Sequence, residues 1–126
     1  MKIAVQHAGL VCRSEETADK FYGDLLGLEK KGPAILPKNL SASIFGVDTD
    51  LTMIHYMKDG LHFEIFVHES LEKRPNPIEH QCISVENRDV FIERCRSMGV
   101  ALNLIPKGEK LLVFITDFDG NLFEIK

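Results

Sequence analysis

The chain has 126 residues, a mass of 14.2 kDa and a formal net charge of −4, with 44% hydrophobic and 27% charged residues. This composition is typical of a folded protein. The basic residues are scattered along the chain, so the charge pattern of a nucleic-acid-binding protein is missing. No apolar run approaches the roughly 20 residues that span a membrane, and Gln6 and His7 interrupt the N-terminal apolar stretch before a signal-peptide core is complete. We therefore expect a single cytoplasmic domain over residues 1–126 that contacts neither nucleic acid nor membrane.

The first half of the chain begins with a β-rich segment from Ile3 to Cys12. Ser14 is the expected N-cap of a helix, because Glu15 and Glu16 follow in the first turn and apolar residues recur at helical spacing until Gly27. Three strands are then expected: Ser41 to Gly46, Leu51 to Lys58 and Leu61 to His68. The Asp59-Gly60 dipeptide between the last two strands predicts a tight hairpin.

The second half repeats this plan after a linker at residues 72–77. A strand at Ile78 to Val85 precedes a helix that begins after Asn87 and ends at Gly99. Three strands complete the half: Ala101 to Ile105, Leu111 to Thr116 and Leu122 to Lys126. The chain separation between His7 and Gly27 differs by one position from that between His80 and Gly99, which indicates a duplication. The first half carries about a dozen more residues, which we expect loops and strand ends to absorb between Gly32 and Gly60.

Each half is too small to bury a sheet face alone. The sequence therefore predicts an α+β fold of two βαβββ modules, residues 1–71 and 78–126, in which the helices cover one sheet face and the other face lines a cleft.

Polar residues recur at matching positions on the face turned away from the helices. In the last strand of the first half, alternation directs Phe63 and Ile65 toward the helix and Glu64 toward the cleft. Glu124 takes the same position in the last strand of the second half. The first strands add one imidazole each, His7 and His80.

Two imidazoles and two carboxylates converging on one cleft predict a metal site, because buried carboxylates need a cation. This ligand set suits one divalent ion of Zn, Ni, Co, Mn or Fe, with positions left open for water or substrate. The competing interpretation is a hydrogen-bonded polar cluster, or two acids on half-exposed strands.

A tight turn at Asp59-Gly60 would pair Lys58 with Leu61 and so place His55 opposite Glu64 and Met57 opposite His62. His55 and His62 are thus candidates to orient Glu64 or a substrate, with simple packing as the alternative. The same face supplies candidate apolar walls of a substrate pocket, for which ordinary core packing is the alternative: Phe66, Met53, Met57, Cys82 and Leu122.

Three cysteines, Cys12, Cys82 and Cys95, are an odd number without C-x-x-C spacing. They predict neither a disulfide framework nor a thiolate zinc site, and we expect reduced packing residues.

The stretches QHAGLVCRSEETADKFYGDLLGLE, IEHQCISVENRDVFIERCRSMGV and FITDFDGNLFEI resemble the vicinal-oxygen-chelate superfamily over essentially the whole chain. This superfamily includes glyoxalase I, bleomycin-resistance proteins, fosfomycin-resistance enzymes, methylmalonyl-CoA epimerase and extradiol dioxygenases. The resemblance implies a cupped mixed sheet around a metal held by His7, Glu64, His80 and Glu124. A complete His/Glu/His/Glu set is most similar to that of glyoxalase I.

Two positions depart from glyoxalase I. Val11 stands where that family has an arginine that binds glutathione, and His68 stands where it has an asparagine. Both differences argue against glutathione as the cosubstrate.

By this resemblance the protein is a metal-dependent isomerase or lyase that acts on a small oxygenated substrate through an enediolate. Glu124 would be the base, and Glu64 a ligand and possible second base. Two alternatives are an Fe(II) ring-cleaving dioxygenase that uses His7, His80 and Glu124, and a non-catalytic binding protein of the bleomycin-resistance type. Family members often dimerise, so we expect a homodimer.

Overall fold

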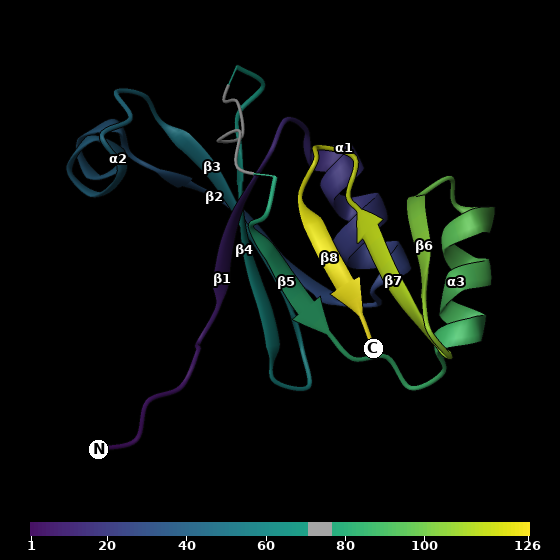
Figure 1. Ribbon diagram of the computed structural model, residues 1–126. Helices are drawn as coiled ribbons and strands as arrows, with labels where there is room; N and C mark the ends of the chain where they lie inside the picture. Colours follow the sequence, from purple (N-terminus) through teal and green to yellow (C-terminus); the bar gives the residue numbers. More distant parts are fainter. Residues whose placement is uncertain (71–76) are drawn as a thin grey trace. The chain divides into compact units, whose positions relative to one another are not determined.

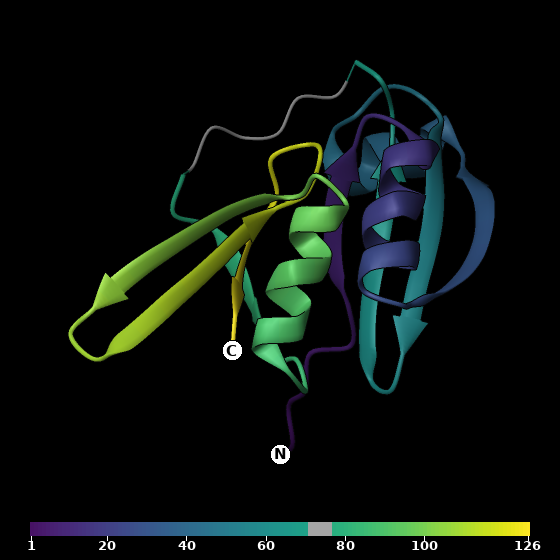
Figure 2. The ribbon, with the colours of Figure 1, turned by 90° about the vertical axis from the view of Figure 1, so that its right-hand side faces the viewer.

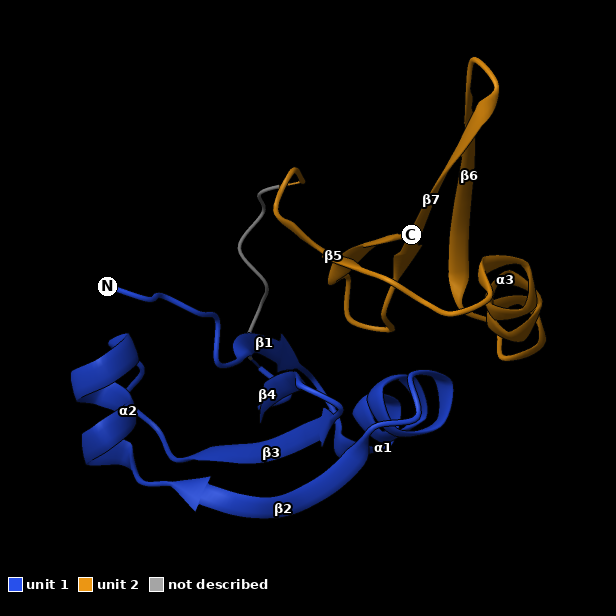
Figure 3. Cartoon of the chain, turned by 90° about the horizontal axis from the view of Figure 1, so that it is seen from below, with its two compact units in different colours: residues 1–72 blue, residues 73–126 orange. Residues whose placement is uncertain are grey.

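The computed structural model describes residues 1–70 and 77–126 of the chain. It divides into two compact units, residues 1–72 and 73–126, which Figure 3 distinguishes by colour. Each unit contains a four-stranded mixed sheet and helical segments, which confirms an α+β fold of two modules (Figure 1). Residues 72–76 of the predicted linker lie outside the described residues.

The sheet of the first unit has the strand order β1-β4-β3-β2. Its strands are β1 (Ala8–Cys12), β2 (Glu29–Leu36), β3 (Leu51–Lys58) and β4 (Leu61–Val67). The first and last strands pair in parallel, and the other pairs are antiparallel. Asp59 and Gly60 join β3 to β4 with φ values of 51° and 86°, so the predicted hairpin is confirmed. Its register also pairs His55 with Glu64, as expected.

The second unit repeats this topology, with the strand order β5-β8-β7-β6. Its strands are β5 (His80–Ile83), β6 (Ala101–Lys107), β7 (Lys110–Thr116) and β8 (Leu122–Ile125). Here too the first and last strands pair in parallel. The matching pairings support the internal duplication inferred from sequence spacing.

Both predicted helices begin at the expected caps. The Ser14 side chain accepts a hydrogen bond from the Thr17 amide at the start of α1 (Glu15–Ala18), which continues as the π-helical segment η1 (Asp19–Leu25). The Asn87 side chain likewise accepts from the Val90 amide at the start of α3 (Arg88–Ser97). These bonds satisfy amides that have no partner within the helix.

Helix α1 with η1, and helix α3, each lie against one face of the sheet of their own unit (Figure 2). In the first unit Phe63 and Ile65 are at most 1% exposed, and the Tyr22 ring of η1 packs against Phe63 at 5.4 Å between centroids. In the second unit Phe123 and Ile125 are equally buried. Because side chains alternate along a strand, Glu64 projects from the sheet face opposite to Phe63 and Ile65. Glu124 likewise projects from the sheet face opposite to Phe123 and Ile125.

The predicted strand from Ser41 to Gly46 is wrong: this segment lies in helix α2 (Lys38–Phe45), at the ends of β2 and β3 (Figure 3). The buried Ser41 hydroxyl donates to backbone carbonyl oxygens, among them that of Val47 at 2.8 Å. Gly46 ends the helix with a φ of 70°. The helix occupies part of the extra length predicted for the first half, and strand β2 before it was not predicted.

The first strand is shorter than predicted, because it begins at Ala8 and not at Ile3. Its partner β4 starts at Leu61, and Ala8 pairs with Phe63, so the residues before it soon run past the end of the partner strand. Ile3 and Val5 are accordingly more than 80% exposed.

All three cysteines are free, and Cys12 and Cys95 are buried as expected, whereas Cys82 is exposed. Within the described ranges, the structure has no helix that is both long and apolar enough to cross a membrane.

Candidate metal centre

The first unit brings an imidazole and a carboxylate together on the sheet face opposite to Phe63 and Ile65. His7 lies immediately before β1, and its Nε2 is 3.5 Å from Oε2 of Glu64 on β4. A Cβ atom added at Gly9 would lie 3.6 Å from the Phe66 ring, so the side-chain position of Gly9 is on the same sheet face as Glu64 and Phe66. The Glu64 side chain is only 16% exposed, so its charge lies mostly out of water.

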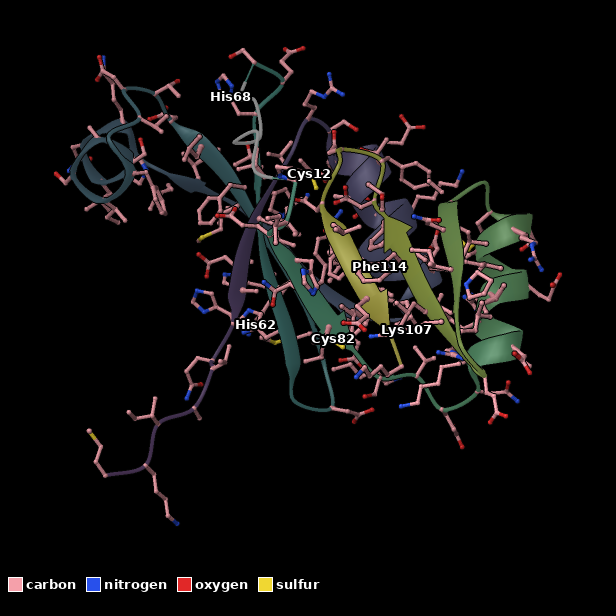
Figure 4. The ribbon with its side chains drawn as sticks, in the orientation of Figure 1. Cys12, His62, His68, Cys82, Lys107 and Phe114 are labelled. Atoms are coloured by element: carbon pink, nitrogen blue, oxygen red, sulfur yellow. The ribbon has the colours of Figure 1, made fainter. Side chains whose placement is uncertain are left out.

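Two further imidazoles surround Glu64. Nδ1 of His55 lies 3.8 Å from Oε2 of Glu64 and shares a 2.8 Å hydrogen bond with Nε2 of His62 (His62 is labelled in Figure 4). The ring of His62 also lies 5.3 Å from that of His7, between centroids. Desolvation, and then the proximity of His55 and His7, lower the pKa of His62 below its usual value. This surrounding favours the neutral form of the His62 imidazole, which is the form that binds metals.

The second unit contains the equivalent pair. Nε2 of His80 on β5 lies 3.8 Å from Oε2 of Glu124 on β8, whose side chain is 20% exposed. Cys82, also labelled in Figure 4, pairs with Glu124 across the parallel strands. Desolvation, and then the Glu124 carboxylate, raise the pKa of the Cys82 thiol.

The backbone contact of His80 selects its tautomer. Its Nδ1 donates a hydrogen bond to the Ile78 carbonyl at 2.7 Å. A neutral imidazole with its proton on Nδ1 presents a lone pair on Nε2. That lone pair and the Glu124 carboxylate are both acceptors, so a cation between them would be favourable. A metal-binding histidine commonly has this second hydrogen bond to a carbonyl.

The donor atoms within each pair have a spacing that fits a shared metal ion. At metal–ligand distances of about 2.1 Å, two ligands lie about 3.0 Å apart at a right angle and about 3.4 Å apart at a tetrahedral angle. The His7–Glu64 separation of 3.5 Å matches the tetrahedral value, and the His80–Glu124 separation of 3.8 Å requires only a small side-chain movement.

Among residues 1–70 and 77–126, no three His, Cys, Asp or Glu side chains are arranged to hold a metal ion. Each unit supplies one histidine and one glutamate of the predicted ligand set. A site that uses all four predicted ligands thus stays a prediction.

The duplicated frameworks differ in what surrounds the glutamate. Phe114 is the cross-strand partner of Glu124, in the position that His55 takes beside Glu64. Leu122 likewise takes the position of His62, two residues before the glutamate. The first unit therefore surrounds its carboxylate with imidazoles, whereas the second surrounds it with apolar side chains.

Two hollows lie next to this part of the second unit. One has a volume of about 300 Å³ and is lined by Ala101, Leu102, Asn103, Ile105, Phe114, Thr116 and Leu122. The other is wider, at about 1020 Å³, and its lining includes Glu124 together with Lys107, Lys110 and Lys126. The lining of the wider hollow thus contains both basic side chains and the carboxylates of Glu109 and Glu124.

Several of these residues were not among the sequence candidates. Phe114 lies in an apolar stretch of sequence, where no adjacent residue is charged. Phe45 lies in the helix that was expected to be a strand. The Phe45 ring packs against Phe66 at 5.1 Å between centroids, so α2 contributes to the apolar surface beside Glu64. The cross-strand pairing of Met57 with His62 and of Met53 with Phe66 places both methionines on the same face, as expected.

No family model and no curated protein matches the chain. Solved structures do match it over nearly their full length. A glyoxalase family protein from Enterococcus faecalis is 19% identical, with a TM-score of 0.76 over 97% of this chain and 95% of that one. A glyoxalase family protein from Bacillus cereus is 14% identical, with a TM-score of 0.76 over 99% and 93%. The chain has the vicinal-oxygen-chelate fold.

A variant of the fosfomycin resistance protein FosX from Listeria monocytogenes is similar as well. It is 21% identical, with a TM-score of 0.71 over 99% of this chain and 90% of that one. That structure contains Mn(II) and 1S,2S-dihydroxypropylphosphonic acid. At such identities the likeness establishes the fold, and the chemistry of this chain must be argued from its own residues.

Proposed function

We propose that this protein is a divalent-metal-dependent isomerase or lyase that acts on a small oxygenated substrate. His7, Glu64, His80 and Glu124 would hold one Ni, Co, Zn, Mn or Fe ion. The observation that carries the proposal is the repetition of a close His–Glu pair at equivalent positions of two duplicated sheets. Mn(II) in a FosX protein of the same fold supports a divalent ion.

A bound divalent ion would supply Lewis acidity toward a carbonyl or hydroxyl oxygen of the substrate. Glu124 would remove the proton from the neighbouring carbon and return it to the adjacent carbon. A carboxylate suits this role if it is held loosely, and Glu124 has the wider spacing to its histidine partner, at 3.8 Å. The Cys82 thiol would orient this carboxylate by hydrogen bonding to it.

Glu64 has two further imidazoles beside it, which suits a permanent ligand. His55 and His62 are linked by a 2.8 Å hydrogen bond, and His55 also lies 3.8 Å from Glu64. These two residues would orient the Glu64 carboxylate toward the ion. We do not expect glutathione as a cosubstrate, because Val11 offers no charge at the position of the glyoxalase arginine.

A second candidate function is action on a phosphonate. The wider hollow beside Glu124 is lined by Lys107, Lys110 and Lys126, which would favour an anionic group near the carboxylate. A FosX protein of this fold binds a dihydroxypropylphosphonic acid. Incubation of the metal-loaded protein with fosfomycin, followed by phosphorus NMR, tests this candidate: a new phosphonate signal supports it, and unchanged fosfomycin at every metal tried excludes it.

The metal site is tested by metal analysis of the purified protein and of Glu64→Gln and Glu124→Gln. We expect about one ion per four-ligand set in the native protein and weaker binding in both variants. Glu86→Gln, which removes one exposed carboxylate outside the proposed ligand set, is the matched control and should bind metal normally. Unchanged metal content and affinity in both site variants would refute the site. A protein that is purified without metal and is not stabilised by Ni, Co, Zn or Mn would instead support a non-catalytic binding role.

Mixing of variants tests the proposed homodimer and whether a site uses one chain or two. One variant carries His7→Ala with Glu64→Gln, and the other carries His80→Ala with Glu124→Gln. If a site takes one pair from each copy, co-refolding should restore one complete site in each mixed dimer. If a site lies within one chain, the mixture should bind no more metal than the separate variants. Size-exclusion chromatography with light scattering supplies the oligomeric state.

The dioxygenase alternative has its own assay. Oxygen uptake with a catechol, after anaerobic loading with Fe(II), would support ring cleavage. Absence of uptake by iron-loaded protein would exclude it for the catechols tested.

A further inference from the structure

The smaller hollow of the second unit is a distinct feature of its exposed sheet face. It has a volume of about 300 Å³, and most of its lining surface is apolar. Asn103 and Thr116 contribute its polar side chains, and none of the described residues that line it is charged. Such a surface excludes an anionic group, because a charge placed against uncharged walls would lose its hydration without gaining a partner.

This hollow adjoins the proposed metal ligands of its own unit. Phe114, one of its lining residues, pairs directly with Glu124 across β7 and β8. Its ring also packs edge-on against His80, with 5.8 Å between centroids. Leu122 lines the hollow and pairs with His80 across β5 and β8. A ligand held at His80 and Glu124 would therefore have the hollow beside it.

The duplication shows that the apolar character is particular to the second unit. Asn103 pairs with Phe114, whereas Lys31 takes the equivalent position in the first unit, where it pairs with His55. Ala101 pairs with Thr116, whereas Glu29 takes the equivalent position and pairs with Met57. Two charged positions of the first sheet are thus occupied by shorter, uncharged side chains in the second.

We propose that this hollow is a binding subsite for a neutral aromatic or branched aliphatic group of the substrate. The proposal rests on the proposed metal function, because that site would hold the oxygenated end of the same molecule. The volume suits one ring or a short branched chain, since a cavity of about 150 Å³ lined by apolar side chains accommodates benzene. The two uncharged polar residues at its edge tolerate one hydroxyl or ether oxygen.

Acetohydroxamate and benzohydroxamate provide the probes. Both chelate a metal ion through the same two oxygens, and they differ only in a methyl or a phenyl group. Isothermal titration calorimetry on the Mn- or Co-loaded protein measures their affinities. We expect benzohydroxamate to bind at least about tenfold more tightly, because the hollow would remove the ring from water.

Ala101→Phe supplies the test of location. Ala101 is exposed, and an aromatic residue is well tolerated in a strand, so the variant should fold while its ring fills the hollow. We expect it to lose the preference for benzohydroxamate and to bind acetohydroxamate as the native protein does. Ala101→Ser, which leaves the hollow open, should keep the preference. Ala42→Phe, the same change at an exposed position of α2, is the matched control.

The outcomes separate the two proposals. Metal-dependent binding of both probes with equal affinity in the native protein, or an unchanged preference in Ala101→Phe, would overturn the apolar subsite and leave the metal site standing. If neither probe binds in a metal-dependent manner, the proposed function fails, and the subsite fails with it.

Discussion

Asp117 is the centre of a buried hydrogen-bond network in the loop between β7 and β8. Asp117 is only 5% exposed. Its Oδ1 accepts hydrogen bonds from the backbone amides of Asp119 and Asn121 at 2.9 and 2.8 Å. Oδ2 accepts a third bond, from the Asn121 side-chain amide at 2.8 Å. Because this loop leads directly into the strand that carries Glu124, we expect the network to support both stability and the position of that carboxylate.

The substitution Asp117→Asn preserves shape and removes one acceptor. The new carbonyl oxygen can still accept both backbone bonds, but the new NH₂ group then faces the NH₂ group of Asn121. A charge-assisted bond is lost and a buried donor is left without a partner, so we expect the free energy of unfolding to fall by about 2–4 kcal/mol. In the double variant Asp117→Asn with Asn121→Asp, the donor and acceptor are exchanged, so at least about half of this loss should be recovered.

Urea unfolding followed by circular dichroism measures these changes, with the slope of the transition compared between variants. Asp59→Asn is the control, because that residue is exposed and asparagine tolerates its positive φ. The reasoning would be refuted by an Asp117→Asn variant within about 0.5 kcal/mol of the native protein, or by a double variant no more stable than the single one.

Three further predictions concern stability. The Tyr56 hydroxyl donates to Asp19 at 2.7 Å, and burial, followed by this bond, raises the pKa of Tyr56 above its usual value of about 10. The resulting stabilisation is complete below pH about 10 and is lost as the pH rises further. The substitution Tyr56→Phe should therefore lower the free energy of unfolding by about 1–2 kcal/mol at neutral pH and by less at pH about 11, as measured by urea titration. A difference between the variant and the native protein that is the same at both pH values would contradict this. Gly23 lies in η1 with open space where a Cβ would be, so Gly23→Ala should raise the free energy of unfolding by about 0.5–1 kcal/mol. Gly27 has a φ of 71°, so Gly27→Ala should lower it by about 1 kcal/mol or more. Equal effects of the two substitutions would contradict these backbone conformations. Divalent metal at about 100 times its dissociation constant should stabilise the native protein by about 2.7 kcal/mol in thermal or urea unfolding, and an equal gain in Glu64→Gln at the same metal concentration would contradict the assignment of that ligand.

Local signals in the sequence were sufficient for much of the fold. The Asp59-Gly60 turn determined the register of β3 and β4, because a two-residue loop leaves one pairing of the adjoining strands. The caps at Ser14 and Asn87 were equally local, since each side chain bonds an amide three residues away. These features could be predicted because their physical cause lies within a few residues of chain.

The segment of α2 shows where such signals fail. Leu40, Ala42 and Ile44 alternate with serines, which is typical of a half-exposed strand. The helix forms nevertheless, and the Ser41 hydroxyl, buried within it, bonds to carbonyls of the loop that follows. The alternation therefore misled, because the helix depends on bonds to the following loop and on the contact of Phe45 with the distant Phe66, which the alternation does not reveal.

The sequence by itself determined the two-module α+β plan and the alternation that turns Glu64 and Glu124 away from the core, because these depend on periodicity and on duplication. Only the tertiary structure decided what lies next to each carboxylate. His55 and Phe114 occupy equivalent positions beside the two glutamates, yet they become neighbours of those carboxylates only through cross-strand pairing. The apolar hollow arises in the same way, from residues on β6, β7 and β8 that no local pattern connects. Side chains that are distant in sequence meet only when strands pair, which is why the chemistry of the site required the fold.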